Sequence, residues 1–491
     1  MAEKHYLAVD LGAESGRVML GTLAEGELSL EEIHRFPNEP VTVRGTMHWD
    51  VLALYNNILK GIRAYVQSFG SRAAGIGVDT WGVDFALLAS DGALLQNPVH
   101  YRDSRTDGLP EKVTGVMPER DIYRRTGINL LPIYTLCQMV SLRRADSPAL
   151  GAADRFVMMG DLFGYFLTGR KAVERTNAIT TQLYNPRRGD WDAELFETFD
   201  LPLEVMAEII EPGTVLGELD DAVKADTGLE SAPVIAPCTH DTASAVTAVP
   251  ARGEDWAYLS SGTWSILGCL IDEVVTSDAA FEAHMSNELC LDGLRICRNI
   301  MGLWLLQQAR AEWQRQGRTY SYPELVELGR QAPEGGALVD PNDEVFLAPE
   351  NMVEEICDYC RRTGQQTPDN PAQVVRCILE SLALSYHRNL RLLSEMLDRD
   401  FSTLHIVGGG SQNTLLSQFT ADATGLRVLT GPVEATVAGN VLVQALAAGD
   451  VGSAQQIREI VRNSTEEVEY EPEDTAYWED RYADYVRLVK G

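Results

Sequence analysis

The sequence predicts an α/β protein built from two similar domains. The first ninety residues and the segment after residue 255 both begin with apolar strand-like runs joined at glycine-containing turns, and in both an amphipathic helix and a further strand follow. A chain of 491 residues has room for two to four domains of roughly 100–200 residues each. Its composition, 45% hydrophobic and 23% charged, is ordinary for a globular protein and excludes disorder, collagen and coiled coil.

In the first half, three strands are predicted one after another, at His5–Leu11, Arg17–Leu23 and Leu28–Phe36. Residues 50–69 then repeat apolar side chains at helical spacing, with Asp50 as the N-cap candidate. Residues 73–80 form a short apolar strand that ends in charged residues. This order of three strands, a helix and a strand predicts a mixed sheet.

The second half shows a similar order of strands, helix and strand, which predicts a duplicated α/β unit. Its expected strands and helix are Trp256–Leu259, Ser265–Ile271, the helix Gln373–Leu397 and the strand Ser402–Val407. Pro250–Glu254 interrupts two apolar runs, so the expected domains are 1–250 and 251–491. Residues 463–479, rich in Glu and Asp, are expected to form a solvated surface near a short final helix.

The charge of the chain excludes some partners. Lys and Arg total 41 against 72 Asp and Glu, a formal net charge of −31, which repels nucleic acid and anionic membrane surfaces. We therefore expect no nucleic-acid or membrane partner, although backbone N–H groups can still hold a small anion. No signal peptide is expected, and eight dilute cysteines fit reduced thiols in the cytoplasm. Cys357 and Cys360 are expected to be helical neighbours without metal or redox function.

The first chemical motif is the segment from Asp10 to Arg17, where a strand ends at a carboxylate and a glycine-containing turn follows. Successive backbone N–H groups in such a turn suit phosphate oxygens, and Asp10 can hold a hydrated divalent metal. An ordinary hairpin turn is the alternative. The segment matches neither the P-loop pattern nor the dinucleotide-binding glycine pattern.

Two further turns lie in the second half. Ser260–Thr263 is another strand-end turn, with three hydroxyl groups, so the two turns together are suited to one polyphosphate. Gly408–Gly410 follows a strand, and positions without side chains let a flat ring, such as a nucleobase, lie against the backbone. A plain strand-to-helix turn is the alternative for the glycines.

Asp241 is the candidate general base. It follows an apolar strand and precedes small residues that begin a helix, which places a carboxylate at a strand mouth. A helix N-cap is the alternative reading of the same side chain, and His240 is the rival base. Upstream, Asp79–Phe85 and Tyr101–Arg105 mix carboxylates, guanidinium groups and aromatic rings, as a polyol site does.

Taken together, these motifs resemble the FGGY carbohydrate kinases, within the actin-like ATPase superfamily, over about residues 5–450. The segments that carry the resemblance are DLGAESGR, DTWGVDF, HYRDSRT, THDTASAV, SGTWS, RNIMGLWLLQ and HIVGGGSQNTLL. The resemblance implies two ribonuclease-H-like domains with a cleft between them, ATP and Mg²⁺ as cofactors, and phosphoryl transfer to a sugar hydroxyl. The chain departs from the broad family at Thr135–Met139, which replaces a Lys-x-x-Trp-like signature, and at Glu14, where a small hydroxyl residue is common.

Carried over by position, the resemblance implies three groups of site residues. Those implied to contact ATP are Ala13, Glu14, Ser15, Gly16, Arg17, Thr263, Gln307 and Gly409. Those implied to line the sugar are Gly82, His240, Asp241, Thr242 and Asn299, with Asp241 as the proton acceptor. Asp10 is implied to belong to the metal environment. Glu14 would repel the γ-phosphate unless it points away or acts through metal.

Within the family, DTWGVDF, THDTASAV and RNIMGLW favour L-rhamnulose as the sugar, phosphorylated at its C1 hydroxyl during L-rhamnose catabolism. L-Fuculose and D-xylulose are the alternative substrates. A non-catalytic actin-like sugar sensor is the alternative of another class, but it predicts loss of the carboxylate at 241 or of the phosphate turns, and both are present. An actin-like assembly protein would need no sugar-like constellation. We expect a monomer or a small homo-oligomer.

Overall fold

The computed structural model describes residues 3–490 and divides into two compact units, each made from three segments. The first unit comprises the chain up to Ala248, then Leu270–Ile296 and Ala435–Ser464. The second comprises Val249–Cys269, Cys297–Glu434 and the residues from Thr465 onward. The division at residue 250 expected from the sequence treats each domain as one continuous stretch, and it stays a prediction.

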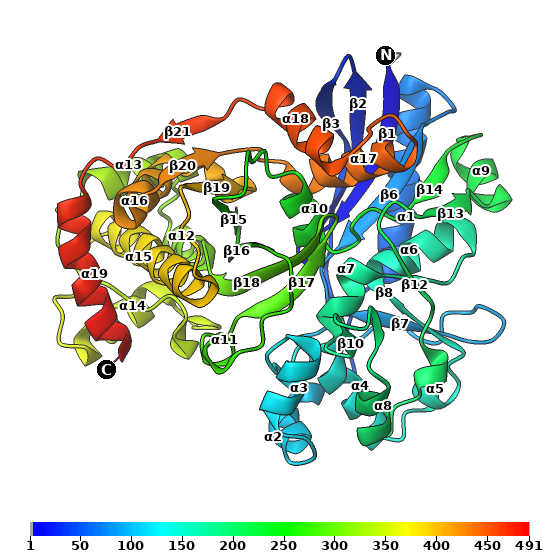
Figure 1. The fold of residues 1–491 in the computed structure, drawn as a ribbon, viewed down its shortest axis with the longest axis horizontal. Helices are drawn as coiled ribbons and strands as arrows, with labels where there is room; N and C mark the ends of the chain where they lie inside the picture. The colour runs from blue at the N-terminus through cyan, green and yellow to red at the C-terminus, as the bar shows by residue number, and fades with distance from the viewer. Residues whose placement is uncertain (1–2, 491) are drawn as a thin grey trace. The chain divides into compact units, whose positions relative to one another are not determined.

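The first unit is centred on a mixed sheet with the strand order β13-β14-β6-β1-β2-β3 (Figure 1). Its strands are β1 (Lys4–Leu11), β2 (Ser15–Ala24), β3 (Glu27–Pro37), β6 (Gly75–Thr80), β13 (Val215–Glu218) and β14 (Pro233–Ile235). β1 is antiparallel to β2 and parallel to β6, and β14 continues the parallel run beside β6. The predicted meander, helix and strand at the start of the chain are confirmed.

The second sheet has the order β17-β18-β16-β15-β19-β20-β21. Its strands are β15 (Trp256–Ser261), β16 (Trp264–Ile271), β17 (Ser286–Cys290), β18 (Gly293–Met301), β19 (Thr403–Val407), β20 (Arg427–Thr430) and β21 (Val468–Tyr470). β15 is antiparallel to β16 and parallel to β19, which is parallel to β20, and β21 returns antiparallel. This repeats the pattern of β2, β1, β6, β14 and β13, so the predicted duplication is confirmed.

Helix α1 (Val51–Phe69) shows why the predicted helices form. Its N-cap Asp50 accepts a hydrogen bond from the Ala53 N–H, which satisfies one of the free amides of the first turn. Apolar residues at helical spacing give it one buried face, including Ile58 and Ile62. In the second unit, the predicted amphipathic helix is α15 (Pro371–Leu397), whose N-cap is Asn370.

Helix α17 (Ala435–Ala447) belongs to the first unit, although it lies near the end of the chain. It contacts β1 and β6, as well as α10 (Asp241–Thr247), and Figure 1 shows it beside the first strands of the chain. A Cβ at Gly439 would come within 1.9 Å of the Ser244 carbonyl oxygen, so only glycine permits this approach of α17 to α10. On its sheet side, Gln444 Nε2 donates to the Leu7 carbonyl.

Among the described residues, the first unit also contains other helices and four small two-stranded sheets. They are β4 (Val41–Val43), β5 (Thr46–His48), β7 (Phe85–Leu88), β8 (Arg155–Met158), β9 (Val173–Glu174), β10 (Tyr184–Asn185), β11 (Asp190–Trp191), β12 (Ile209–Ile210), α2 (Leu109–Thr114), α3 (Glu119–Thr126), α4 (Thr135–Arg144), α5 (Pro148–Gly151), α6 (Met159–Thr168), α7 (Arg175–Ala178), α8 (Ala193–Thr198), α9 (Asp221–Thr227), α11 (Asp278–Glu282) and α18 (Ala454–Ser464).

The remaining helices of the second unit are α12 (Trp304–Arg315), α13 (Tyr322–Gln331), α14 (Met352–Arg362), α16 (Thr414–Thr424) and α19 (Thr475–Lys490). Cys357 and Cys360 lie on α14, as predicted. The expectation for the acidic C-terminal region was partly wrong, because α19 is long and buries Trp478 and Tyr485. Within residues 3–490, no helix combines the length and the apolar character needed to cross a membrane.

Candidate active site

The carboxyl ends of β1 and β6 bring two acidic residues together. These strands are parallel, and Asp10 is the register partner of Asp79. One residue further, Thr80 forms a parallel bridge with His240, which immediately precedes α10. Because parallel strands end at one edge of a sheet, Asp10, Asp79 and Asp241 meet at this edge. We call it the acidic edge of the first unit.

Asp79 lies at the back of the acidic edge and is fully buried. The Asn440 amide of α17 donates to its Oδ2, while its Oδ1 has no hydrogen-bond partner within residues 3–490. Burial raises the pKa of Asp79 well above its usual value, and the neighbouring carboxylates of Asp10 and Asp241 raise it further. At the acidic edge the neighbouring carboxylates therefore disfavour the ionised form of Asp79.

The predicted phosphate turn joins β1 to β2. Arg17 Nη2 donates to Asp10 Oδ2 at 2.5 Å, a pair that the antiparallel register places side by side. Asn38 pins the turn, because its side chain donates to the Gly12 carbonyl and its N–H to the Glu14 carbonyl. Ala13 and Ser15 are half-buried, Gly16 is buried and the Glu14 side chain is exposed.

Asp241 is the first residue of α10. The N-cap residue is His240, so the alternative interpretation of Asp241 as the N-cap is wrong. Its Oδ1 accepts from the Thr242 N–H at 2.5 Å and from the Thr242 hydroxyl at 3.2 Å, and its side chain is one-third exposed. Burial raises the pKa of Asp241, and the nearby Asp10 carboxylate raises it further, while His240 lowers it. A raised pKa makes this carboxylate a stronger base.

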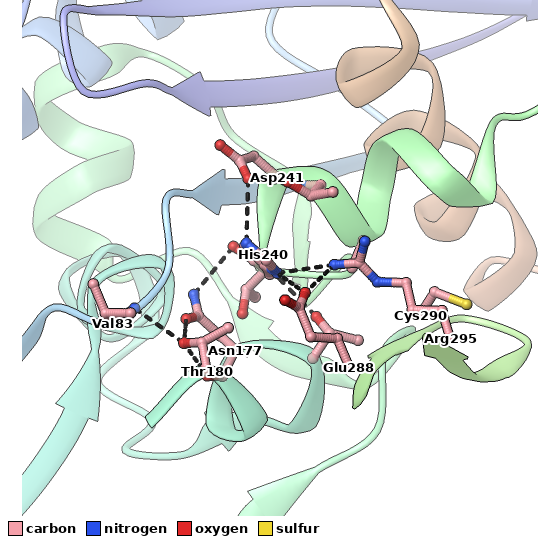
Figure 2. A network of polar contacts seen from close by, with 12 residues as sticks. Val83, Asn177, Thr180, His240, Asp241, Glu288, Cys290 and Arg295 are labelled. Atoms are coloured by element: carbon pink, nitrogen blue, oxygen red, sulfur yellow. Dashed lines mark hydrogen bonds and ion pairs between the residues drawn. The ribbon is translucent and has the colours of Figure 1, made fainter. Parts of the chain in front are cut away.

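His240 lies in a chain of polar contacts behind Asp241 (Figure 2). Its Nε2 is 3.5 Å from Asp241 Oδ1, and its Nδ1 is 3.5 Å from Arg295 Nη2 and 3.6 Å from Glu288 Oε2. Arg295 and Glu288 form a buried ion pair. Burial is the largest cause of a lowered His240 pKa, so the ring is neutral at pH 7.

Glu174 binds the backbone just before Asp241. This fully buried carboxylate accepts from the Thr239 N–H at 2.8 Å and from the N–H and hydroxyl of Thr176. Burial raises the pKa of Glu174 to about 7, against the lowering effect of these hydrogen bonds. The loop that carries His240 and Asp241 therefore rests on a second acidic group that has no direct access to solvent.

Gly82 and Val83 form a tight corner after β6. A Cβ at Gly82 would come 2.9 Å from Thr180 Oγ1, so a larger residue would displace that side chain. Val83 has a φ of 68°, which is rare for a β-branched residue. Its N–H donates to Thr180 Oγ1, and its carbonyl accepts from Thr135 and Gln138, which together hold the strained conformation.

Part of the expected polyol site is internal structure. Asp84 is fully buried; its Oδ2 accepts from the indole N–H groups of Trp49 and Trp81, and its Oδ1 accepts from Gln138. Because Asp84 is fully buried and both of its oxygens have donors, its expected contact with a sugar is wrong. Trp81 and Phe85, the aromatic residues of the same segment, lie in the hydrophobic core.

In the second unit, the turn at Gly262–Thr263 is fixed by its backbone. The Thr263 carbonyl accepts from the N–H groups of Gly302 and Trp304, which ties the turn to the start of α12. Gln307 lies in the first turn of this helix, half-buried. Asn299 is exposed on β18 and is not tied to this turn by any contact that the described residues record.

The three glycines after β19 differ in what surrounds them. Added Cβ atoms at Gly408 and Gly410 would come 3.0 Å and 2.1 Å from Ser261 atoms, whereas nothing lies within 4 Å of one at Gly409. Gly409 is also exposed. The glycines on either side therefore serve close packing on β15, and the middle one offers an open backbone surface.

The donor set of the acidic edge fits Mg²⁺, a cation that prefers oxygen ligands and retains several waters. Asp10 and the unpartnered Oδ1 of Asp79 supply carboxylate oxygens, and a cation there would offset their mutual repulsion. Within residues 3–490, no group of three acidic, His or Cys side chains is arranged to hold a metal by itself. Such a site suits a metal that is shared with phosphate oxygens and water.

Four residues of this region were not identified from the sequence: Glu174, Glu288, Arg295 and Asn440. Each lies far along the chain from the motif it contacts. Asn440 lies within an apolar helical run, where a single amide gives no local signal. Glu288 and Arg295 alternate with apolar residues on β17 and β18, which indicates only a strand.

Comparison with known proteins gives consistent results over the whole chain. Residues 5–248 match the N-terminal domain of the FGGY family of carbohydrate kinases, and residues 257–448 match its C-terminal domain. A rhamnulokinase of Bacteroides thetaiotaomicron is 42% identical over 489 residues, covering 99% of this chain and 100% of the relative. A rhamnulokinase of Bacillus subtilis strain 168 is 38% identical and covers 96% of both chains.

Solved structures share the fold at low sequence identity. A xylulose kinase from Lactobacillus acidophilus superposes with a TM-score of 0.80 at 15% identity, covering 99% of this chain and 98% of that one. The glycerol kinase of Plasmodium falciparum, solved with ADP, superposes with a TM-score of 0.78 at 16% identity and the same coverage. The expected fold class, two actin-like ATPase domains, is thereby confirmed.

Proposed function

Since the chain belongs to the FGGY family of carbohydrate kinases, we propose that it transfers the γ-phosphoryl group of ATP to the C1 hydroxyl of L-rhamnulose. The product is L-rhamnulose 1-phosphate, in L-rhamnose catabolism. The observation that carries the catalytic part of this proposal is the acidic edge, where Asp241 stands beside Asp10 and Asp79 at the ends of parallel strands. Phosphoryl transfer needs positioned phosphates, a metal and a group that takes the hydroxyl proton.

Asp241 is the proposed proton acceptor. Its partly exposed carboxylate has Oδ1 engaged by Thr242, so Oδ2 is the oxygen that receives the hydroxyl proton. Its raised pKa favours proton transfer near neutral pH. The sugar is proposed to lie against Gly82, His240 and Thr242, with Asn299 as a further contact.

The nucleotide is proposed to use turns from both units. In the first, Ala13–Arg17 would offer backbone N–H groups and the Arg17 guanidinium to the phosphates. In the second, Thr263 and Gln307 would contact ATP, and the open backbone at Gly409 would lie by the adenosine. The exposed Glu14 side chain would contact ATP only through a cation, because a carboxylate repels phosphate directly.

Mg²⁺ would lie near Asp10 and Asp79 and would supply charge neutralisation for the phosphate oxygens. The chain's own part there is to pair Asp10 with Arg17 and to hold Asp79 in place through Asn440.

L-Rhamnulose is proposed because the relatives that match nearly the whole chain at 38–42% identity carry the name rhamnulokinase. L-Fuculose is the nearest alternative, since it also ends in a methyl group and differs only in hydroxyl stereochemistry. A site that hydrogen-bonds each hydroxyl rejects an epimer strongly, because a mismatch leaves buried polar groups unpaired.

The test is an ADP-release assay with L-rhamnulose, L-fuculose, D-xylulose and glycerol as acceptors, using Asp241→Asn protein from the same preparation route as the control for contaminating kinases. We expect the highest kcat/KM with L-rhamnulose. A higher value for another ketose would overturn the substrate assignment and leave the kinase activity standing. ADP release with none of the acceptors would contradict the proposed function as a whole.

A further inference from the structure

Glu288 and Arg295 form an ion pair inside the first unit. They lie on neighbouring strands β17 and β18, the Arg295 side chain is fully buried, and that of Glu288 is 8% exposed. Such a pair adds little net stability, because removing two charges from water offsets most of their attraction. The pair touches His240, which separates it from Asp241 (Figure 2).

The contacts of His240 select one tautomer of its neutral ring. A guanidinium has only N–H donors, so His240 Nδ1 must accept from Arg295 Nη2 and carry no proton. The proton then resides on Nε2, where it faces Asp241 Oδ1 at 3.5 Å. The opposite tautomer would direct an N–H at the guanidinium and a lone pair at the carboxylate, which is unfavourable at both nitrogens.

Glu288 orients Arg295 for its hydrogen bond to His240 Nδ1. Its Oε2 lies 3.6 Å from His240 Nδ1 and accepts one N–H of Arg295 Nη2, which leaves the second N–H of that nitrogen to donate to Nδ1. With this donor directed at Nδ1, a ring proton on Nδ1 would face the guanidinium. Glu288 in turn balances the charge of a guanidinium that has little contact with water.

We infer that Arg295 and Glu288 are positioning residues that hold His240 as the Nε2–H tautomer, so that His240 and Thr242 both engage Asp241 Oδ1 and leave Oδ2 to face the sugar hydroxyl. This inference rests on the proposed function, in which Asp241 accepts that proton. Among the described residues, every recorded polar contact of the Asp241 carboxylate involves Oδ1. A carboxylate held at one oxygen presents the other in a fixed direction, which proton transfer requires.

Arg295→Met is the informative variant. It removes the donor to Nδ1 and leaves Glu288 available to take the ring proton, so the ring should change to the Nδ1–H tautomer. We expect kcat to fall about 10- to 100-fold, the usual effect of losing a group that orients a site residue. The KM for ATP should stay within about twofold, because the predicted nucleotide turns do not include these residues.

The double variant Glu288→Gln/Arg295→Met separates positioning from packing. The glutamine amide can donate to Nδ1 and restore the Nε2–H tautomer, so kcat should recover about tenfold over Arg295→Met. Arg295→Lys, which keeps a charge and donors, should also retain the tautomer. Asp292→Asn is the matched control, since Asp292 lies in the turn that joins β17 to β18 and pairs with Arg458 of α18 without contacting His240, and it should leave kcat unchanged.

The direct readout is the ¹⁵N spectrum of the imidazoles in histidine-labelled protein, with the signal of His240 among the eight histidines assigned by its loss in His240→Gln. Wild type should show the proton on Nε2, and Arg295→Met should show it on Nδ1. A wild-type ring protonated on Nδ1 overturns the inference, even if a variant fails to fold. Equal kcat losses in the single and double variants, with an unchanged tautomer, overturn it as well.

The outcomes distinguish this inference from the proposed function. If no sugar is phosphorylated, or if Asp241→Asn turns over normally, the proposed function fails, and with it the catalytic meaning of the tautomer. If Asp241→Asn is inactive and Arg295→Met is fully active, the proposed function stands and the positioning role is wrong.

Discussion

The two units carry the same strand pattern, but they end it with different chemistry. At the carboxyl ends of β1 and β6 the first unit presents Asp10 and Asp79, whereas in the second unit β15 ends in Ser261 and Gly408 directly follows β19. The first turn is fixed by an ion pair and by the Asn38 side chain, and the second by backbone hydrogen bonds and close glycine packing. A duplicated framework therefore supplies an acidic edge in one unit and an uncharged, glycine-lined edge in the other.

The difference matches a division of labour in phosphoryl transfer. In the proposed function, carboxylates serve the metal and the hydroxyl proton, which would place the reacting groups with the first unit. An uncharged edge with an open backbone at Gly409 suits a nucleoside, which needs surface more than charge. Substitutions in the first unit should therefore change kcat most, and substitutions in the second should change the KM for ATP.

The largest effect is expected at Asp241. Asp241→Asn removes the proposed proton acceptor but keeps the shape and the Oδ1 acceptor, so kcat should fall by a factor on the order of 10²–10⁴ while ATP binding and the unfolding temperature persist. ADP release and nucleotide titration would measure the two quantities. Turnover near that of wild type would transfer the role of base to His240.

The next largest effect is a pH dependence of stability, which we expect in the first unit and not in the second. Glu174 has a pKa of about 7 in the folded protein against about 4.3 for a free glutamate, so the folded state keeps a proton that the unfolded chain releases. The stabilising contribution of Glu174 should therefore be complete below about pH 4.3, and about 3 kcal/mol of it should be lost as the pH rises through about 7.

Hydrogen exchange, corrected for intrinsic rates, would localise the pH effect. Amides of β14 and α10 should lose protection between pH 5 and pH 7.5, whereas amides of β15 and β16 should not. Glu174→Gln, which has no titrating group, should abolish the difference between the two pH values. An equal loss of protection in both sheets would contradict a local origin at Glu174.

Two separate substitutions, at Gly410 and at Gly409, test the different roles of the glycines that follow β19. Gly410→Ala drives a Cβ toward Ser261 and should lower the unfolding free energy by about 1–3 kcal/mol, as overpacking does. Gly409→Ala meets open space, so it should leave the unfolding temperature unchanged and raise the KM for ATP. Thermal melting and ATP titration measure both. An unchanged KM would remove the middle glycine from the nucleotide surface.

The smallest effect is expected at Thr263. Thr263→Val removes the hydroxyl but keeps the backbone carbonyl that binds Gly302 and Trp304, so the turn should persist. The loss of one hydrogen bond to ATP corresponds to about 0.5–1.5 kcal/mol, or about a 2- to 12-fold rise in the KM for ATP. Steady-state kinetics would show it, and a fall in kcat as large as that of Asp241→Asn would contradict the division between the units.

Much of the fold was predictable because the signals were local. Strand periodicity, the Asp50 cap and glycine turns each specify the structure within a few residues, and the duplication followed from their order. The acidic edge was predictable in part, since Asp10 and Asp241 each follow an apolar strand. That Asp79 faces Asp10 follows from the register of two parallel strands, which periodicity does not specify.

The rest depends on contacts between distant parts of the chain. Asp84 looked like a sugar ligand from its neighbours, but the Trp49 indole and the Gln138 amide, both distant in the sequence, join the nearby Trp81 indole in donating to it. The acidic C-terminal region looked solvated because its charge obscured Trp478 and Tyr485, seven residues apart on one face of α19. Composition measured over a window averages away such a narrow buried stripe.

The return of α17 to the first unit has a consequence for how the protein is made. The helix seals the sheet against β1 and β6 and supplies Asn440 to Asp79, yet it begins at residue 435, almost 190 residues after the first segment of that unit ends. At a synthesis rate of about 5–20 residues per second, roughly 10–40 seconds pass between the synthesis of the first segment of this unit and that of α17. During that interval the face of its sheet that α17 covers stays uncovered, so the growing chain has a built-in period in which a chaperone has apolar surface to bind.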